Sequence, residues 1–141
     1  MPLINEALAA QLKEELAGLK DPVKLVVFSQ ALADPESEQV KRLMEELAAL
    51  DPRLSLESLN FVLEKERAEA MGVKRTPAVA VVGAQDYGVR FYGVPSGYEF
   101  GTLLDAILDV SKAEAGLSPQ TVAALDALEK PVHIQVFSTP T

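Results

Sequence analysis

The sequence contains no cysteine, and this absence excludes more chemistry than any other feature of its composition. Disulfides, thiolate nucleophiles and thiolate metal sites all need cysteine sulfur, so none of them forms within these 141 residues. Histidine is nearly absent as well, because His133 is the only one. A zinc or haem site would need carboxylates gathered around that single imidazole. We therefore expect no metal, no cofactor and no dithiol–disulfide exchange by the chain itself.

A basic surface is also lacking, since 21 acidic and 13 basic residues give a formal net charge of −8. A surface this acidic repels phosphate, so nucleic acids and anionic membrane surfaces are not expected partners. Strongly apolar runs, such as residues 25–28 and 78–82, are strand-sized and far below the roughly 20 residues of a membrane-spanning helix. The first residues lack a basic region followed by an apolar one, so we expect no secretory signal and a cytoplasmic location.

Hydrophobic residues nevertheless make up 48% of the chain, which is enough for the core of one domain. Their spacing alternates between the helical and the strand pattern. Helices are predicted around residues 5–19, 34–50, 63–71, 100–108 and 118–128. Strands are predicted at residues 23–28, 54–60, 78–82, 88–92 and 132–137. Asp34-Pro35 and Ser118-Pro119 begin two of the helices, because Asp and Ser cap a helix and Pro suits its first position.

The order of these elements predicts the fold. Helices join the early strands, so those strands pair in parallel, whereas only residues 83–87 separate the next two strands, which predicts a hairpin. The expected result is an α/β thioredoxin-like fold with a central four-stranded mixed sheet flanked by helices and an extra N-terminal helix. Pro77 directly precedes the third strand and follows Thr76, where thioredoxin-like folds place a cis proline. We therefore predict a cis Thr76–Pro77 bond over the ordinary alternative of a trans proline.

Several segments resemble the protein disulfide oxidoreductases, glutaredoxin-like proteins of thermophilic bacteria and archaea with two thioredoxin-like units in tandem. The most specific segments are residues 23–28 (VKLVVF), 76–78 (TPA), 87–93 (YGVRFYG), 95–100 (PSGYEF) and 109–111 (DVS). The resemblance covers the whole chain. It implies a parent protein that catalyses thiol–disulfide exchange, in which a low-pKa thiolate at a helix start attacks a substrate disulfide and a second thiol resolves it.

The helix after the first strand departs from that family. A Cys-x-x-Cys pair opens this helix in the family's first unit, and the matching positions, counted from Phe28, are Asp34, Pro35, Glu36 and Ser37. The resemblance therefore implies a degenerate active site with no catalytic residue.

The end of the chain departs as well. Residues 134–141 resemble the first strand and loop of the family's second unit and stop one residue short of its Cys-Pro-Tyr-Cys; an ordinary C-terminal strand is the alternative. We therefore expect a thioredoxin-like unit without Cys-x-x-Cys over residues 1–115. A linking helix over 116–130 and the first strand of a truncated second unit over 131–141 would follow it.

The polar residues of the degenerate helix start have two interpretations. Asp34, Glu36 and Glu38 offer carboxylates for acid–base work, but a helix dipole attracts acidic residues to its first turn, and we favour capping. Ser37 offers a hydroxyl, but serine is a weak nucleophile without an adjacent base, and no histidine lies near it in the sequence. A helix cap therefore explains this segment better than a polar binding rim.

Thr76 and Pro77 are candidates for peptide binding. In active thioredoxin-like proteins the backbone before the cis proline pairs with an extended peptide, an interaction that needs no sulfur. A purely structural loop is the favoured alternative. The aromatic residues could form a binding surface, although packing of the hairpin and its following helix explains them more simply. These are Tyr87, Tyr92, Tyr98, Phe91 and Phe100.

Two functions remain open at this point. The chain is interpreted as the non-catalytic N-terminal unit of a glutaredoxin-like protein disulfide oxidoreductase, which packs against a catalytic second unit and helps to hold an extended peptide or protein substrate. The alternative is a stand-alone peptide-binding or scaffold domain that self-associates as a homodimer, its last strand adding to a sheet edge. A relative of the glutathione-binding transferases is a weaker third interpretation, because no all-helical second domain is evident.

Overall fold

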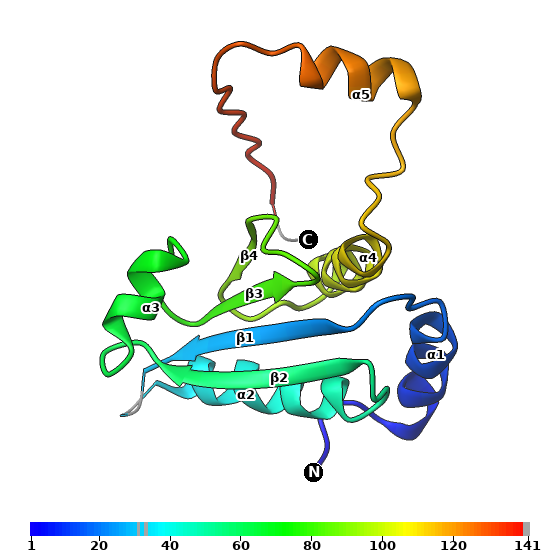
Figure 1. Cartoon of the computed structure of the whole chain (residues 1–141). Coiled ribbons are helices and arrows are strands. Elements are labelled where there is room, and N and C mark those ends of the chain that lie inside the picture. The colour runs from blue at the N-terminus through cyan, green and yellow to red at the C-terminus, as the bar shows by residue number, and fades with distance from the viewer. Residues whose placement is uncertain (31, 33, 140–141) are drawn as a thin grey trace.

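The computed structural model describes residues 1–30, 32 and 34–139, in which helices and strands alternate around one sheet (Figure 1). The helices are α1 (Glu6–Leu16), α2 (Pro35–Ala48), α3 (Lys65–Ala70), α4 (Tyr98–Lys112) and α5 (Pro119–Asp126). The strands are β1 (Val23–Ser29), β2 (Leu54–Asn60), β3 (Ala78–Val82) and β4 (Val89–Tyr92). The sheet order is β2-β1-β3-β4, with β1 parallel to β2 and the other two pairings antiparallel. This arrangement confirms the thioredoxin-like α/β fold predicted from the sequence.

β1 lies inside the sheet, and its side chains alternate between two apolar cores. Leu25 and Val27 belong to the larger core, to which α1, α2 and α4 all contribute side chains. Val26 and Phe28 belong to the smaller core, to which α3 contributes Ala68. Successive side chains of a strand point to opposite faces, so a strand covered on both faces is apolar at nearly every position. This is why residues 25–28 form an unbroken apolar run.

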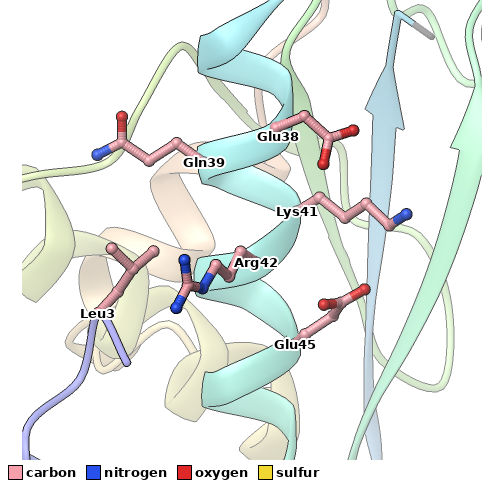
Figure 2. A pocket seen from close by; sticks show the side chains of 6 residues that line it. All are labelled: Leu3, Glu38, Gln39, Lys41, Arg42 and Glu45. Atoms are coloured by element: carbon pink, nitrogen blue, oxygen red, sulfur yellow. The ribbon is translucent and has the colours of Figure 1, made fainter. Parts of the chain in front are cut away.

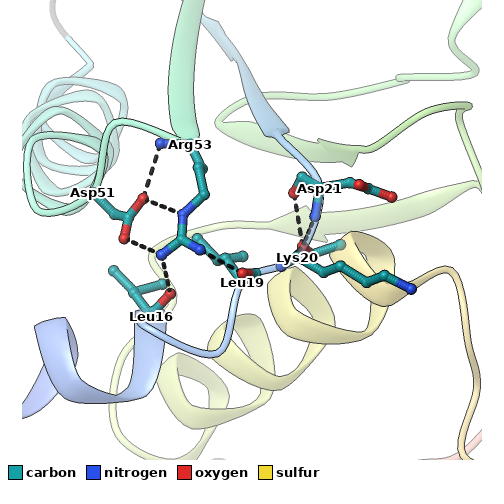
Figure 3. A network of polar contacts seen from close by, with 7 residues as sticks. Leu16, Leu19, Lys20, Asp21, Asp51 and Arg53 are labelled. Atoms are coloured by element: carbon teal, nitrogen blue, oxygen red, sulfur yellow. Dashed lines mark hydrogen bonds and ion pairs between the residues drawn. The ribbon is translucent and has the colours of Figure 1, made fainter.

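α1 ends at Leu16, three residues earlier than the predicted end at residue 19. Figure 3 shows the polar network at this end. The Arg53 guanidinium donates hydrogen bonds to the carbonyl oxygens of Leu16 (3.2 Å) and Leu19 (2.5 Å), and the Asp51 carboxylate accepts from Arg53 Nε at 2.9 Å and Nη2 at 2.7 Å. Carbonyls at a helix end have no partner within the helix, so Arg53 supplies one from the start of β2.

Ser111 ties α4 to the loop between α1 and β1. Its buried hydroxyl accepts hydrogen bonds from the backbone N–H groups of Lys20 (2.8 Å) and Asp21 (3.0 Å) and donates to the carbonyl oxygen of Asp21 (2.7 Å). These groups are about 90 residues apart in the sequence. The network therefore fixes the first helix against the last helix of the packed core.

The strand predicted over residues 132–137 is not formed: residues 131–139 have no regular secondary structure and are exposed, while residues 140 and 141 lie outside the described residues. A strand needs a neighbouring strand to satisfy its backbone groups, and the sheet has its four members without this segment. α5 is also exposed, and Figure 1 shows it beyond α4 and β4, away from the sheet, while the segment that follows it runs back toward β4. Within the described part of the chain, no helix is long and apolar enough to span a membrane.

Candidate functional site

The candidate site lies at the end of the sheet where β1 leads into α2 and Pro77 leads into β3. Phe28 and Ala78 form a pair of the antiparallel β1–β3 ladder. Two residues beyond this pair on either side are Gln30 and Thr76, so the register brings Gln30 beside the Thr76–Pro77 dipeptide. The Thr76–Pro77 peptide bond is cis, in the position where the sequence predicts it. Segments more than 40 residues apart therefore meet here.

Asp34 and Ser37 are joined to each other at the start of α2. Asp34 caps the helix, because its Oδ1 accepts a hydrogen bond from the Ser37 backbone N–H at 3.3 Å. Its Oδ2 accepts a second one from Ser37 Oγ at 2.5 Å. Ser37 is fully buried, and its hydroxyl also accepts a hydrogen bond from the backbone N–H of Gln30 at 3.3 Å. The capping interpretation of Asp34 therefore agrees with the contacts, and the hydroxyl of Ser37 lies out of reach of a substrate.

The carboxylate of Asp34 is held in its charged form. The hydrogen bond from the Ser37 hydroxyl is the main cause that lowers its pKa below the ordinary value, and backbone N–H groups of the first turn add to it. Glu36 and Glu38 lie in the first turn of α2, and both are exposed to solvent. A carboxylate with a lowered pKa is a poor proton donor at neutral pH, so these three residues do not form an acid–base pair.

The backbone of Thr76 is the next feature of the site. Pro77 is buried, and its carbonyl oxygen accepts a hydrogen bond from Gly93 N at 2.9 Å. Thr76 is half-buried, and within residues 1–30, 32 and 34–139 no hydrogen bond involves its backbone N–H or carbonyl. Half-buried backbone groups generally have partners, so this pair is suited to hydrogen bonds from outside the chain.

The Arg75 side chain adds a feature that the sequence does not reveal. Its guanidinium carbon lies 4.3 Å from the centroid of the Tyr92 ring. A cation over an aromatic face at this distance is attractive. Tyr92 lies on β4 and Arg75 precedes Thr76, so the contact fixes the loop before β3 against the sheet edge. Sequence spacing alone does not pair residues from separate strands.

Comparison with known proteins finds redox relatives of this fold. The alkyl hydroperoxide reductase AhpF of Staphylococcus aureus (strain Mu50 / ATCC 700699) is 31% identical over 140 residues, 99% of this chain and 25% of the relative. The crystal structure of the NTD_N/C domain of AhpF from Enterococcus faecalis has a TM-score of 0.80 and 28% identity, covering 89% of this chain and 61% of that one. A protein disulfide oxidoreductase from Aeropyrum pernix has a TM-score of 0.79 and 28% identity, covering 91% and 56%. The chain is a thioredoxin-like homologue of these redox proteins.

The homology confirms the predicted resemblance to protein disulfide oxidoreductases and adds AhpF as a second relative. The sequence pointed to the protein disulfide oxidoreductases, whereas the comparisons also bring in the N-terminal domain of AhpF, which was not anticipated. The cysteine-free chain fits a degenerate N-terminal unit of such proteins. This thioredoxin-like homologue spans about a quarter of the length of the curated relatives it matches. No protein-family model matches the chain.

The aromatic residues do not gather into one surface on this thioredoxin-like unit. Phe91 and Phe100 contribute to the larger core and Tyr92 to the smaller one. Tyr87 and Tyr98 are exposed. The simple packing interpretation therefore accounts for three of the five, and no shared aromatic platform is formed.

The described residues contain no group of three or more His, Asp or Glu side chains that could hold a metal ion. His133, which the sequence singled out, lies in the exposed segment after α5.

A groove of about 360 Å³ runs along the outer side of α2 (Figure 2). Its lining combines two acidic, two basic and one amide side chain with one leucine: Leu3, Glu38, Gln39, Lys41, Arg42 and Glu45. Arg42 also pairs with Glu46, whose carboxylate accepts hydrogen bonds from the backbone N–H groups of Leu3 (2.9 Å) and Ile4 (2.7 Å). These polar groups hold the N-terminal residues against α2, so Arg42 and Glu46 bind the protein itself and not a ligand. Thr76 and Pro77 are not among the lining residues.

Proposed function

We propose that this chain is the non-catalytic first thioredoxin-like unit of a two-unit thiol–disulfide protein. The observation that carries the proposal is the start of α2, where the hydrogen-bonded Asp34–Ser37 pair stands at the positions that the family resemblance matches to a Cys-x-x-Cys pair. The homology to redox proteins that extend well beyond the matched region supports a parent with a catalytic second unit. In that unit a thiolate would attack a substrate disulfide, and a second thiol would resolve the mixed disulfide.

Oxygen chemistry does not replace the missing sulfur at this helix start. The Ser37 hydroxyl is buried and donates to a carboxylate that is already charged, so it has neither access to a substrate nor a free base. The proposed role of the unit is therefore to pack against the catalytic unit and to help hold its substrate. A stand-alone scaffold remains the alternative, and the natural reading frame distinguishes them, because only the proposed parent encodes a Cys-x-x-Cys beyond Thr141.

Insulin reduction tests whether catalysis belongs to the proposed second unit and not to this chain. With dithiothreitol as the reductant, we expect this chain to leave the rate of insulin precipitation at its uncatalysed value. A chain extended through the second unit is expected to accelerate it. Acceleration by the 141-residue chain alone would overturn the proposal, since it contains no sulfur nucleophile.

A cysteine pair introduced at the helix start tests the assignment of positions. The thiol that Asp34→Cys introduces would sit at the cap of α2, where backbone N–H groups lower the pKa of a thiol, and Ser37→Cys would place the second thiol one turn away. We expect the double variant to form an internal disulfide on oxidation and to accelerate insulin reduction. Each single variant is the matched control and should do neither. A double variant that stays reduced would show that positions 34 and 37 are not the counterparts of the catalytic pair.

The proposed substrate contact is the backbone of Thr76. Its half-buried N–H and carbonyl groups support main-chain pairing with an extended peptide, as in strand addition. Reduced, carboxymethylated insulin B chain serves as the probe in a titration followed by NMR. We expect shifts confined to residues near Gln30, Thr76 and Gly93. Thr76→Ala should retain binding because the backbone donor remains, whereas Thr76→Pro should abolish it. Equal binding by both folded variants would contradict the proposal.

A further inference from the structure

The guanidinium of Arg75 is stacked on an aromatic ring one residue before Thr76. Its central carbon lies 4.3 Å from the centroid of the Tyr92 ring, and Arg75 is exposed. Within residues 1–30, 32 and 34–139, neither a hydrogen bond nor a salt bridge occupies this guanidinium. Stacking takes up the face of a guanidinium, whereas its N–H donors point outward in its plane. The ring therefore holds the group in place and leaves its donors available to a partner.

Two other arginines show how this fold uses a guanidinium for structure. Arg53 donates hydrogen bonds to the Asp51 carboxylate and to two backbone carbonyl oxygens. Arg90 donates to the Asp86 carboxylate and to backbone carbonyl oxygens as well. Arg75 has no such carboxylate among the described residues. A carboxylate from outside the chain would supply the partner that the other two arginines find within it.

The segment around Arg75 is positive on an otherwise acidic chain. Residues 70–85 contain Lys74 and Arg75 and no acidic residue, whereas the whole chain has a net charge of −8. Both cations are exposed, and neither has a salt-bridge partner in the part of the chain that the structure describes. An anionic ligand is therefore attracted to this segment and repelled by most of the remaining surface.

The negative charge of the candidate site lies on the other side of Thr76. Thr76 leads into β3, which has β1 on one side and β4 on the other. The carboxylate of Asp34, whose lowered pKa keeps it charged, lies at the start of α2, after β1. Arg75 instead contacts Tyr92 of β4. An acidic side chain on a peptide that lies across Thr76 is therefore favoured toward β4 and disfavoured beside α2.

We propose that Arg75 selects an acidic residue in the peptide that pairs with the Thr76 backbone. The carboxylate of a Glu or Asp in that peptide accepts hydrogen bonds from the guanidinium, whose planar donor set suits both carboxylate oxygens. Main-chain pairing supplies affinity for any extended segment, while Arg75 supplies the preference among segments. The inference rests on the proposed function, because it names the substrate class of the same site.

Two short peptides that differ at one position test the proposal. They are Ser-Thr-Val-Glu-Val-Thr-Ser with both ends blocked, and the same peptide with Gln in place of Glu. Each is titrated into the unmodified chain and followed by NMR. We expect both peptides to shift the resonances of Thr76, and the Glu peptide to bind about three- to tenfold more tightly at about 50 mM salt. The preference should shrink at about 500 mM salt, because salt screens exposed charges.

Substitutions of Arg75 test whether this residue recognises the charge. In Arg75→Gln the two peptides should bind equally, within about twofold. Arg75→Lys keeps the positive charge but not the planar donors, so it should retain only part of the preference. Lys13→Gln is the matched control, because it removes the same charge from an exposed position in α1, which Figure 1 shows at the opposite end of the sheet from α3. This variant should keep the full preference, and circular dichroism verifies that all three variants are folded.

Three outcomes would overturn the inference, and they separate it from the proposed function. Equal binding of the two peptides to the unmodified chain would refute the role of Arg75 while leaving the Thr76 contact intact. A preference for the Glu peptide that survives Arg75→Gln would also refute it, because the carboxylate would then be bound elsewhere. Absence of binding by both peptides would refute the Thr76 contact of the proposed function, and the inference would fail with it.

Discussion

Replacing Asp51 with asparagine should lower the free energy of unfolding by about 1–2 kcal/mol at neutral pH. The carboxylate accepts hydrogen bonds from the Arg53 backbone N–H, Nε and Nη2, all between 2.7 and 2.9 Å (Figure 3). The side-chain hydrogen bonds from Arg53 are the main cause that lowers the pKa of Asp51 from its ordinary value of 3.8 to about 2. The pair thus stabilises the charged carboxylate in the folded chain.

The magnitude follows from this shift. One pKa unit corresponds to about 1.4 kcal/mol, which sets an upper value of about 2.5 kcal/mol for the folded state's preference for the carboxylate. The Arg53 side chain is 37% exposed and that of Asp51 12%, so solvent screens part of the interaction. In Asp51→Asn the guanidinium still donates to the carbonyl oxygens of Leu16 and Leu19, so the end of α1 keeps its partner.

The pH dependence has a definite sign. The folded pKa lies below the value of about 3.9 in the unfolded chain, so the stabilisation is complete above about pH 5 and is lost as the pH falls toward 2. The difference in unfolding free energy between the unmodified chain and Asp51→Asn should therefore shrink with acidification. Urea unfolding at about pH 7 and about pH 3, followed by far-UV circular dichroism, measures it.

Asp105→Asn, on the exposed side of α4, is the matched control for this change. A surface substitution of this kind should alter stability by less than about 0.5 kcal/mol at either pH. The reasoning is refuted by a difference for Asp51→Asn that stays constant between the two pH values. An unchanged stability at neutral pH would refute it equally.

Four further substitutions probe the packing of α4, each measured by urea unfolding. Gly83→Ala should destabilise the folded chain by about 1–3 kcal/mol, because the added Cβ would lie 2.7 Å from Val110 Cγ1 and 3.0 Å from the Val110 carbonyl oxygen. The Cβ that Gly101→Ala adds has no neighbouring atom within 4 Å, so this variant should stabilise the helix by about 0.5–1 kcal/mol. Equal effects of the two would contradict this. Ser111→Ala should cost about 1–3 kcal/mol, since it removes three part-buried hydrogen bonds to the backbone of Lys20 and Asp21; a neutral effect would mean that water replaces the hydroxyl. Leu103→Ala should cost about 2–5 kcal/mol for a fully buried side chain, and a loss below about 1 kcal/mol would indicate that the core collapses around the gap.

Local chemistry made much of the fold predictable. The apolar run at residues 25–28 identified a strand, which the structure buries on both faces, and Asp34-Pro35 identified the start of α2, because these signals depend on neighbours in the sequence. The cap formed by Ser118 was visible for the same reason. The position of the cis bond at Pro77 needed more, since only the order of strands distinguished it from an ordinary proline.

The remaining features depend on residues that are distant in the sequence. Arg53 reaches carbonyl groups 34 and 37 residues away, and no spacing rule anticipates where such a guanidinium lies. The predicted strand at residues 132–137 has a correct local pattern but no neighbour to pair with, and a strand is defined by its partner. The burial of Ser37 was likewise hidden, because it depends on tertiary contacts such as the hydrogen bond that its hydroxyl accepts from the Gln30 backbone N–H.

The start of α2 explains how this fold persists without sulfur. A helix end must satisfy its first backbone N–H groups, and Asp34 does so directly, while its second oxygen binds the Ser37 hydroxyl. Ser37 in turn holds the N–H of Gln30, so the segment that would carry reactive thiols is fixed by hydrogen bonds alone. Stability at this position therefore does not require cysteine, which is consistent with the proposed non-catalytic unit whose Thr76 backbone binds a peptide. The selective effects expected for Thr76→Pro and for the cysteine pair at positions 34 and 37 follow from that proposal.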